Sequence, residues 1–157
     1  LDANELTLRL YAAESGAYFE EVVGDRASEL HPAMRRRLDL PPATLADYVA
    51  AEAAVERLRR DLAAFFRRYD VLLCPTAPVV APPHDAEEIR IGGAAFAPRT
   101  SMRATIPFAL TGSPALTVPF SRSPEGLPIG VQLVGGRFED ETVLRAGTLV
   151  ERAAYPG

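Results

Sequence analysis

We consider four side chains of this sequence as candidate nucleophiles or proton carriers: Ser113, Cys74, His31 and His84. Hydrolytic enzymes combine an activated serine or cysteine with a base and with donors for an oxyanion. Asp85 follows His84, but adjacent residues cannot easily present a Ser-His-Asp geometry to one serine, and no serine occurs in a G-x-S-x-G turn. The two histidines also lack the i, i+4 spacing of a helical metal pair.

Ser113 lies in "TGSPALTVPF", at a predicted turn from a helix into a strand. Pro114 comes next and has no backbone N–H to offer to an oxyanion, so a turn serine bonding its own backbone explains this position better than a nucleophile does. Cys74, the only cysteine, ends a predicted buried strand, where we expect a thiol of the core or of a pocket wall. A single cysteine forms no internal disulfide and no cysteine metal cluster.

Two absences limit the chemistry further. All 17 basic residues are arginines, so no lysine amine of this chain can act as base or nucleophile. The glycine pairs at 92–93 and 135–136 lack the spacing of a phosphate-binding loop or a dinucleotide fold. We therefore expect no catalytic residue, no metal site and no cofactor in these residues. Because the chain begins with Leu1 rather than Met, we expect it to continue from an upstream segment.

The spacing of apolar residues predicts the helices. One runs from a capping box at Asp2 to about Val23, and a longer one has an N-cap at Thr44 and an apolar stripe that reaches Tyr69. A last helix begins at Asp140, and its apolar side consists of Val143, Ala146, Gly147 and Val150. Thr105 can cap a short helix that Gly112 ends in the left-handed conformation.

Three apolar runs are the best strand candidates: "DVLLC" (70–74), "ALTVPF" (115–120) and "IGVQLV" (129–134). The first is wholly apolar and predicts a central strand. In the second, Leu116, Val118 and Phe120 should share one face, as should Ile129, Val131 and Leu133 in the third. "IRIGGAAF" predicts a small hairpin. We expect an α/β fold, with helices packed on an open mixed β-sheet, residues 1–157 as one domain, and the long helix ending near Tyr69 packed on the sheet.

Composition excludes several classes of protein. A net charge of −4 and a pI near 5.2 argue against a nucleic-acid partner, and the "RRR" at 35–37 is best interpreted as a solvated helix end rather than as an anion contact. No run of about 18 apolar residues occurs, and the first residues do not form a signal peptide, so we expect a cytoplasmic protein with no membrane partner. Nothing in the sequence indicates an oligomeric state.

Three longer segments carry a family resemblance: "YDVLLCPTAPVVAPP" (69–83), "TIPFALTGSPALTVPF" (105–120) and "EGLPIGVQLVGGRFEDETVLRAGTLVE" (125–151). Together with the helical region before Asp70, they resemble the carboxy-terminal part of the amidase signature family, in the order that the family has them. The resemblance covers nearly the whole chain. It implies the amidase signature fold and the hydrolysis of small-molecule carboxamides by a Ser-Ser-Lys triad.

The family carries this triad in its amino-terminal part, in a Gly- and Ser-rich signature that the present sequence lacks. The resemblance therefore implies that this chain forms a pocket wall, and that the nucleophile belongs to an upstream segment. The residues expected at the substrate pocket, from strand ends and turns within the family-like motifs, are Thr76, Thr111, Gly112, Ser113 and Gln132.

Two positions distinguish members of the family. The acidic residue with which the glutamine-hydrolysing subunit of the glutamyl-tRNA(Gln) amidotransferase recognises glutamine would fall near Met102, so a general amidase fits better than that subunit. The family usually has Asn at the position of Ala109, where its side chain could bond the following loop. A third possibility is a structural or interaction domain that keeps the fold without the catalytic half.

Overall fold

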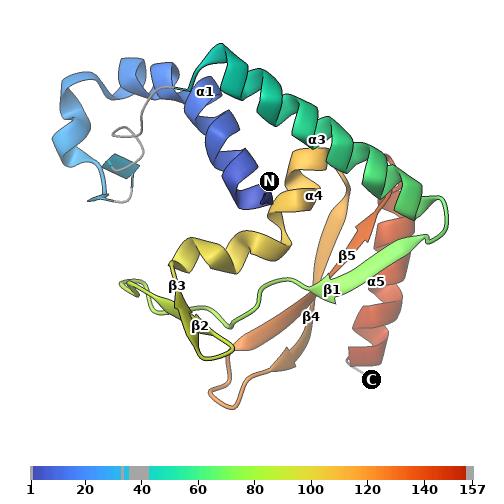
Figure 1. Ribbon diagram of the computed structural model, residues 1–157. Helices are drawn as coiled ribbons and strands as arrows, with labels where there is room; N and C mark the ends of the chain where they lie inside the picture. Colours follow the sequence, from blue (N-terminus) through green and yellow to red (C-terminus); the bar gives the residue numbers. More distant parts are fainter. Residues whose placement is uncertain (1, 33, 36–42, 155–157) are drawn as a thin grey trace. The chain divides into compact units, whose positions relative to one another are not determined.

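The computed structural model describes residues 2–32, 34–35 and 43–154 (Figure 1). They fall into two compact units, Leu1–Arg57 and Leu58–Gly157, which divide within one helix. The single domain of residues 1–157 stays a prediction. Of the "RRR" segment, Arg36 and Arg37 lie outside the described residues, whereas Arg35 donates hydrogen bonds of 3.2 and 2.6 Å to the carbonyls of Ala27 and Ser28.

The first unit contains α1 (Ala3–Val23), the short 3₁₀ helix η1 (Gly24–Glu29) and the first part of α3 (Leu45–Phe66). The predicted first helix is confirmed. The carboxylate of Asp2 accepts a 2.9 Å bond from the N–H of Asn4, but Glu5 pairs with Arg9 at 2.7 Å. Asp2 therefore caps α1, and Glu5 has a cationic partner one turn away.

The start of α3 has the cap that the sequence predicts. The N–H of Asp47 donates to Thr44 Oγ1 at 3.1 Å, and the N–H of Thr44 donates to Asp47 Oδ2 at 3.3 Å. These bonds satisfy two backbone donors, and the hydrogen bonds from Thr44 lower the pKa of Asp47. The far end differs from the prediction, because α3 stops at Phe66 and leaves the exposed Tyr69 outside the helix.

In the second unit, β1 (Val71–Pro75), β4 (Ala115–Arg122) and β5 (Pro128–Gly135) form one sheet in the order β1-β5-β4. The prediction that these three segments share a sheet is confirmed. The prediction that "DVLLC" is central was wrong, because β5 is the middle strand and Leu73 of β1 is 56% exposed. In β5, Leu133 and Val134 point to opposite faces and both are buried, which is the mark of a central strand.

The α/β class with helices on an open sheet is confirmed. Within the described residues both pairings of this sheet are antiparallel, so the parallel pairing that a mixed sheet requires is not among them. The register shifts between Pro119 and Ser121, and this irregularity turns Phe120 outward, contrary to the predicted alternation. Pro119 fits because β4 is an edge strand, where a missing N–H costs no ladder bond.

The sheet is covered by α5 (Asp140–Ala154), which lies along it in Figure 1. Val143 packs with Val118 and Leu133, and half-buried apolar residues surround this core: Val71, Leu116, Ala146 and Val150. The apolar side predicted for the last helix is thus confirmed. Gly147 lets α5 approach so closely that a Cβ at this position would collide with the side chain of Leu116. That the longer helix α3 also packs on the sheet stays a prediction.

The segment between β1 and β4 contains a hairpin and two short helices. The hairpin consists of β2 (Ile89–Ile91) and β3 (Ala94–Phe96), which turn at Gly92 and Gly93 as predicted. The helices are η2 (Pro98–Ala104) and α4 (Ile106–Thr111). Thr105 stands before α4, but its hydroxyl bonds the carbonyl of Met102 and makes no cap bond to α4. None of the helices in the described ranges is long and apolar enough to cross a bilayer.

The close approach of α5 to β4 leads to a stability prediction. Gly147→Val should lower the free energy of unfolding by about 1–3 kcal/mol, because the added methyl groups must displace Leu116. Gly16→Val is the matched control, because it lies in helix α1 with no atom within 4 Å of the added Cβ; it should change the free energy of unfolding by less than about 0.5 kcal/mol. Urea unfolding followed by circular dichroism measures both. Equal effects at the two positions would contradict the packing described here.

Candidate functional site

The turn between α4 and β4 brings three of the predicted site residues together. Gly112 has φ 68° and ψ 32°, the left-handed conformation that the sequence predicts, and it ends α4. Its N–H donates to the carbonyl of Ala109 at 3.4 Å, and the N–H of Ser113 donates to that of Phe108 at 3.1 Å. Ala109 itself is exposed, and backbone bonds form this turn.

The hydroxyl groups of Thr111 and Ser113 are 3.1 Å apart. Thr111 is 1% exposed, and its hydroxyl also lies within hydrogen-bond distance of the carbonyls of Pro107 at 2.9 Å and Phe108 at 3.3 Å. Either hydroxyl can donate across the contact between Thr111 and Ser113. A threonine hydroxyl is no base, so this contact does not activate Ser113.

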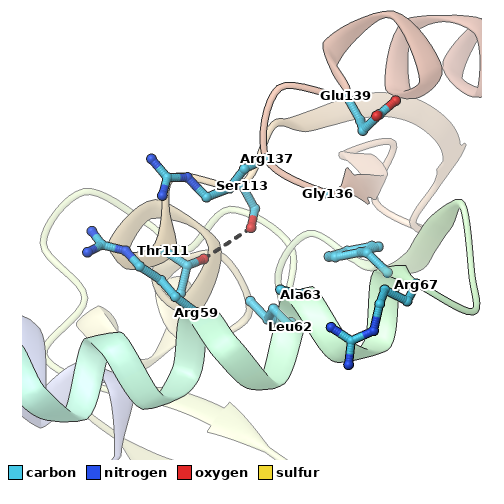
Figure 2. Close-up of a pocket in the computed structure, with 10 residues that line it drawn as sticks. Arg59, Leu62, Ala63, Arg67, Thr111, Ser113, Gly136, Arg137 and Glu139 are labelled. Atoms are coloured by element: carbon cyan, nitrogen blue, oxygen red, sulfur yellow. Dashed lines mark hydrogen bonds between the residues drawn. The ribbon is translucent and has the colours of Figure 1, made fainter.

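Thr111 and Ser113 line a pocket of about 300 Å³ in the second unit, and Figure 2 shows the side chains around it. One wall comes from α3, where Arg59, Leu62, Ala63 and Phe66 follow the i, i+3, i+4, i+7 spacing of one helix face, with Arg67 beside them. The opposite wall follows β5 and contains Gly136, Arg137 and Glu139. The pocket thus has an apolar lining between charged groups.

The charged groups around this pocket are three arginines and one glutamate. Arg59 Nη2 donates to the carbonyl of Leu110 at 3.2 Å. Arg137 places its guanidinium carbon 5.3 Å from the centre of the Phe138 ring, a cation–π contact, and its Nε lies 3.8 Å from the position that a Cβ on Gly112 would occupy. Glu139 Oε2 accepts a 3.0 Å bond from the hydroxyl of Thr142. Two guanidinium groups therefore border the same backbone segment, residues 110–112.

Gln132, another predicted site residue, does not line this pocket. It is 2% exposed, and its side-chain amide donates to the carbonyls of Ala104 at 2.8 Å and Pro75 at 3.3 Å. One amide thereby connects the central strand to the end of β1 and to the end of η2. Both amide hydrogens are thus used within the protein.

Thr76 follows β1 and also lies away from this pocket. Its hydroxyl bonds that of Thr117 at 3.3 Å, and its N–H donates to the carbonyl of Gly130. Gly130 lies near the start of β5, whereas the pocket adjoins Gly136, beyond the other end of that strand. The structure therefore groups Thr111, Gly112 and Ser113, and it separates Thr76 and Gln132 from them.

Sequence reasoning missed the charged residues of the pocket: Arg59, Arg67, Arg137 and Glu139. The spacing of Arg59 with Leu62 and Phe66 on one helix face was an available signal. Arginine on an apolar helix face commonly extends to solvent, however, and nothing in the sequence relates Arg59 to Arg137. In the described part of the chain, no group of three or more His, Cys, Asp or Glu side chains is arranged to hold a metal ion.

The fold is that of a known class of protein. A family model described as "Amidase" matches residues 4–144, and the chain belongs to the amidase signature family. Among solved structures, one titled "Crystal structure of amidase" superposes with a TM-score of 0.88 at 33% identity, over 98% of this chain and 36% of that one. A bacterial aryl acylamidase shares the fold at 21% identity, with a TM-score of 0.78.

Curated relatives bear two kinds of name. A glutamyl-tRNA(Gln) amidotransferase subunit from Roseiflexus castenholzii is 34% identical over 87% of this chain and 28% of its own length. A fatty acid amide hydrolase of Medicago truncatula is 36% identical over 69% of this chain and 18% of its own length. The chain thus spans less than a third of the length of these two curated relatives.

The contacts of Gln132 generate a second prediction. Gln132→Leu should lower the free energy of unfolding by about 1–3 kcal/mol, because it leaves the carbonyls of Ala104 and Pro75 without this donor. Thr76→Val removes one exposed hydroxyl contact and should stay within about 0.5 kcal/mol of the parent protein. Chemical denaturation of the two variants makes the comparison. A neutral Gln132→Leu would mean that the amide does not hold these segments together.

Proposed function

We propose that this chain is the carboxy-terminal part of an amide-hydrolysing enzyme, and that it forms a wall of the substrate pocket around Thr111, Gly112 and Ser113. The observation that carries the proposal is the superposition of 98% of the chain on one third of an amidase, with a TM-score of 0.88 at 33% identity. A segment that keeps its fold this closely retains the surfaces on which the rest of such an enzyme is built.

The catalytic serines and lysine of this proposal belong to an upstream segment. The chain contains no lysine, and the Thr111 hydroxyl, 3.1 Å from that of Ser113, is no base that could take up its proton during an attack on a carbonyl. Pro114 also offers no N–H to an oxyanion. In the proposed enzyme the turn at Gly112 shapes the pocket. Gln132 fixes the central strand β5, which leads to Gly136.

A second candidate is the glutamine-hydrolysing subunit of a glutamyl-tRNA(Gln) amidotransferase, the enzyme for which several of the curated relatives are named. The solved amidotransferase subunit from Thermotoga maritima is 28% identical and superposes with a TM-score of 0.58, below the value of 0.88 for the amidase. Met102, near the position expected for a glutamine-recognising acid, is an apolar side chain that is 49% exposed. Both observations favour a general amidase.

The proposal predicts where activity will be found. The purified chain should hydrolyse no aryl or aliphatic amide above background, because removing the nucleophile or the base of a catalytic set costs about 10⁶-fold. The same chain joined to its natural upstream segment should turn over such amides. The assay compares the two proteins on one panel of amides, with glutamine included.

Three other outcomes have distinct meanings. Turnover by the isolated chain that disappears in Ser113→Ala or Cys74→Ala would show that the chain is itself a complete enzyme. Activity of the joined protein on glutamine alone would favour the amidotransferase. Inactivity of the joined protein on every amide would favour a structural or interaction domain derived from an amidase.

A further inference from the structure

We propose that the pocket beside Ser113 binds the carboxylate of a small organic acid, and that Arg59 and Arg137 recognise this group. The inference concerns binding by this chain itself, so it does not depend on the proposed hydrolytic activity. All the residues that line the pocket belong to the second unit, which is compact by itself.

The side chains that line the pocket carry a net positive charge. Three arginines and one glutamate line it, a formal balance of +2 in a protein whose net charge is −4. Glu139 accepts a hydrogen bond from Thr142. Among the residues that the structure describes, neither Arg67 nor Arg137 forms an ion pair, and the ion pairs found there lie elsewhere. An anion in the pocket would meet an excess of positive charge.

The positions of two guanidinium groups indicate where the anion would lie. Arg59 donates to the carbonyl of Leu110, and Arg137 Nε lies beside Gly112, so both groups border residues 110–112. They reach this segment from α3 and from the segment after β5, as Figure 2 shows. An anion bound beside this segment would be attracted by both groups. Arginine is suited to this role because its planar fork matches the two oxygens of a carboxylate.

The rest of the pocket lining indicates the size and polarity of the ligand beyond its carboxylate. Leu62, Ala63 and Phe66 supply an apolar surface between the charged groups. The volume of about 300 Å³ is at the lower end of ligand pockets, which suits a compact molecule. A carboxylate with a short aromatic or aliphatic body satisfies both parts, whereas inorganic phosphate satisfies only the charges.

The test uses the full chain of 157 residues and 3-phenylpropionate as the probe, with 3-phenylpropionamide as the neutral isostere and inorganic phosphate as the second anion. Isothermal titration calorimetry should give an affinity for the acid that is at least about tenfold higher than for the amide, and that falls as salt is added. Phosphate should bind more weakly than the acid because it leaves the apolar surface uncovered.

Variants locate the site. Arg137→Met should weaken binding of the acid about tenfold, and Arg137→Lys should weaken it less, since it keeps the charge but loses the fork. Glu139→Gln should strengthen binding several-fold by removing the one negative charge of the lining. Arg152→Met, an exposed position in the last turn of α5, removes the same charge away from the pocket and is the matched control.

The possible results of these binding measurements have different meanings. Preference for the acid, loss in Arg137→Met and gain in Glu139→Gln together support the carboxylate site. Equal binding of acid and amide, no binding of either, or equal effects of Arg137→Met and Arg152→Met would overturn it. Inactivity of the joined protein toward amides bears on the proposed function alone and leaves these binding results standing.

Discussion

The side-chain amide of Gln132 is the contact on which the second unit depends. It lies on the central strand, at 2% exposure, and holds carbonyls at the ends of β1 and η2. A buried amide whose partners were missing would be destabilising, so these segments are constrained to meet it. The segment from η2 to α4 is thereby placed over the sheet, and the turn at Gly112 follows directly from the end of α4.

The two faces of β5 contact different parts of the second unit. On one face Leu133 packs with Val143 of α5, and this contact requires a glycine in the helix where Leu116 approaches. On the other face Gln132 secures the segment that leads to Thr111 and Ser113. The pocket lies past the end of this doubly buried strand, so its walls are carried by elements that packing and hydrogen bonds hold in place.

Features that depend on a few neighbouring residues were predicted correctly from the sequence. The cap at Thr44, the left-handed Gly112 and the hairpin at Gly92 each depend on a few neighbouring residues, and the structure has all three. The choice of central strand depends on which segments flank β5. It cannot be obtained from periodicity, because the polar Gln132 concealed the burial of β5.

The arginines of the pocket escaped prediction for a related reason. Each of Arg59 and Arg137 is ordinary in its own segment, and only the fold brings both to residues 110–112. The turn residues found from sequence, Thr111 and Ser113, have no activated nucleophile, since among the described residues neither hydroxyl is hydrogen-bonded to a histidine or a carboxylate. Under the proposals made here, guanidinium groups and shape are therefore what these residues contribute to recognition. A pocket wall built this way would select a ligand by its charge and size and leave bond breaking to other residues.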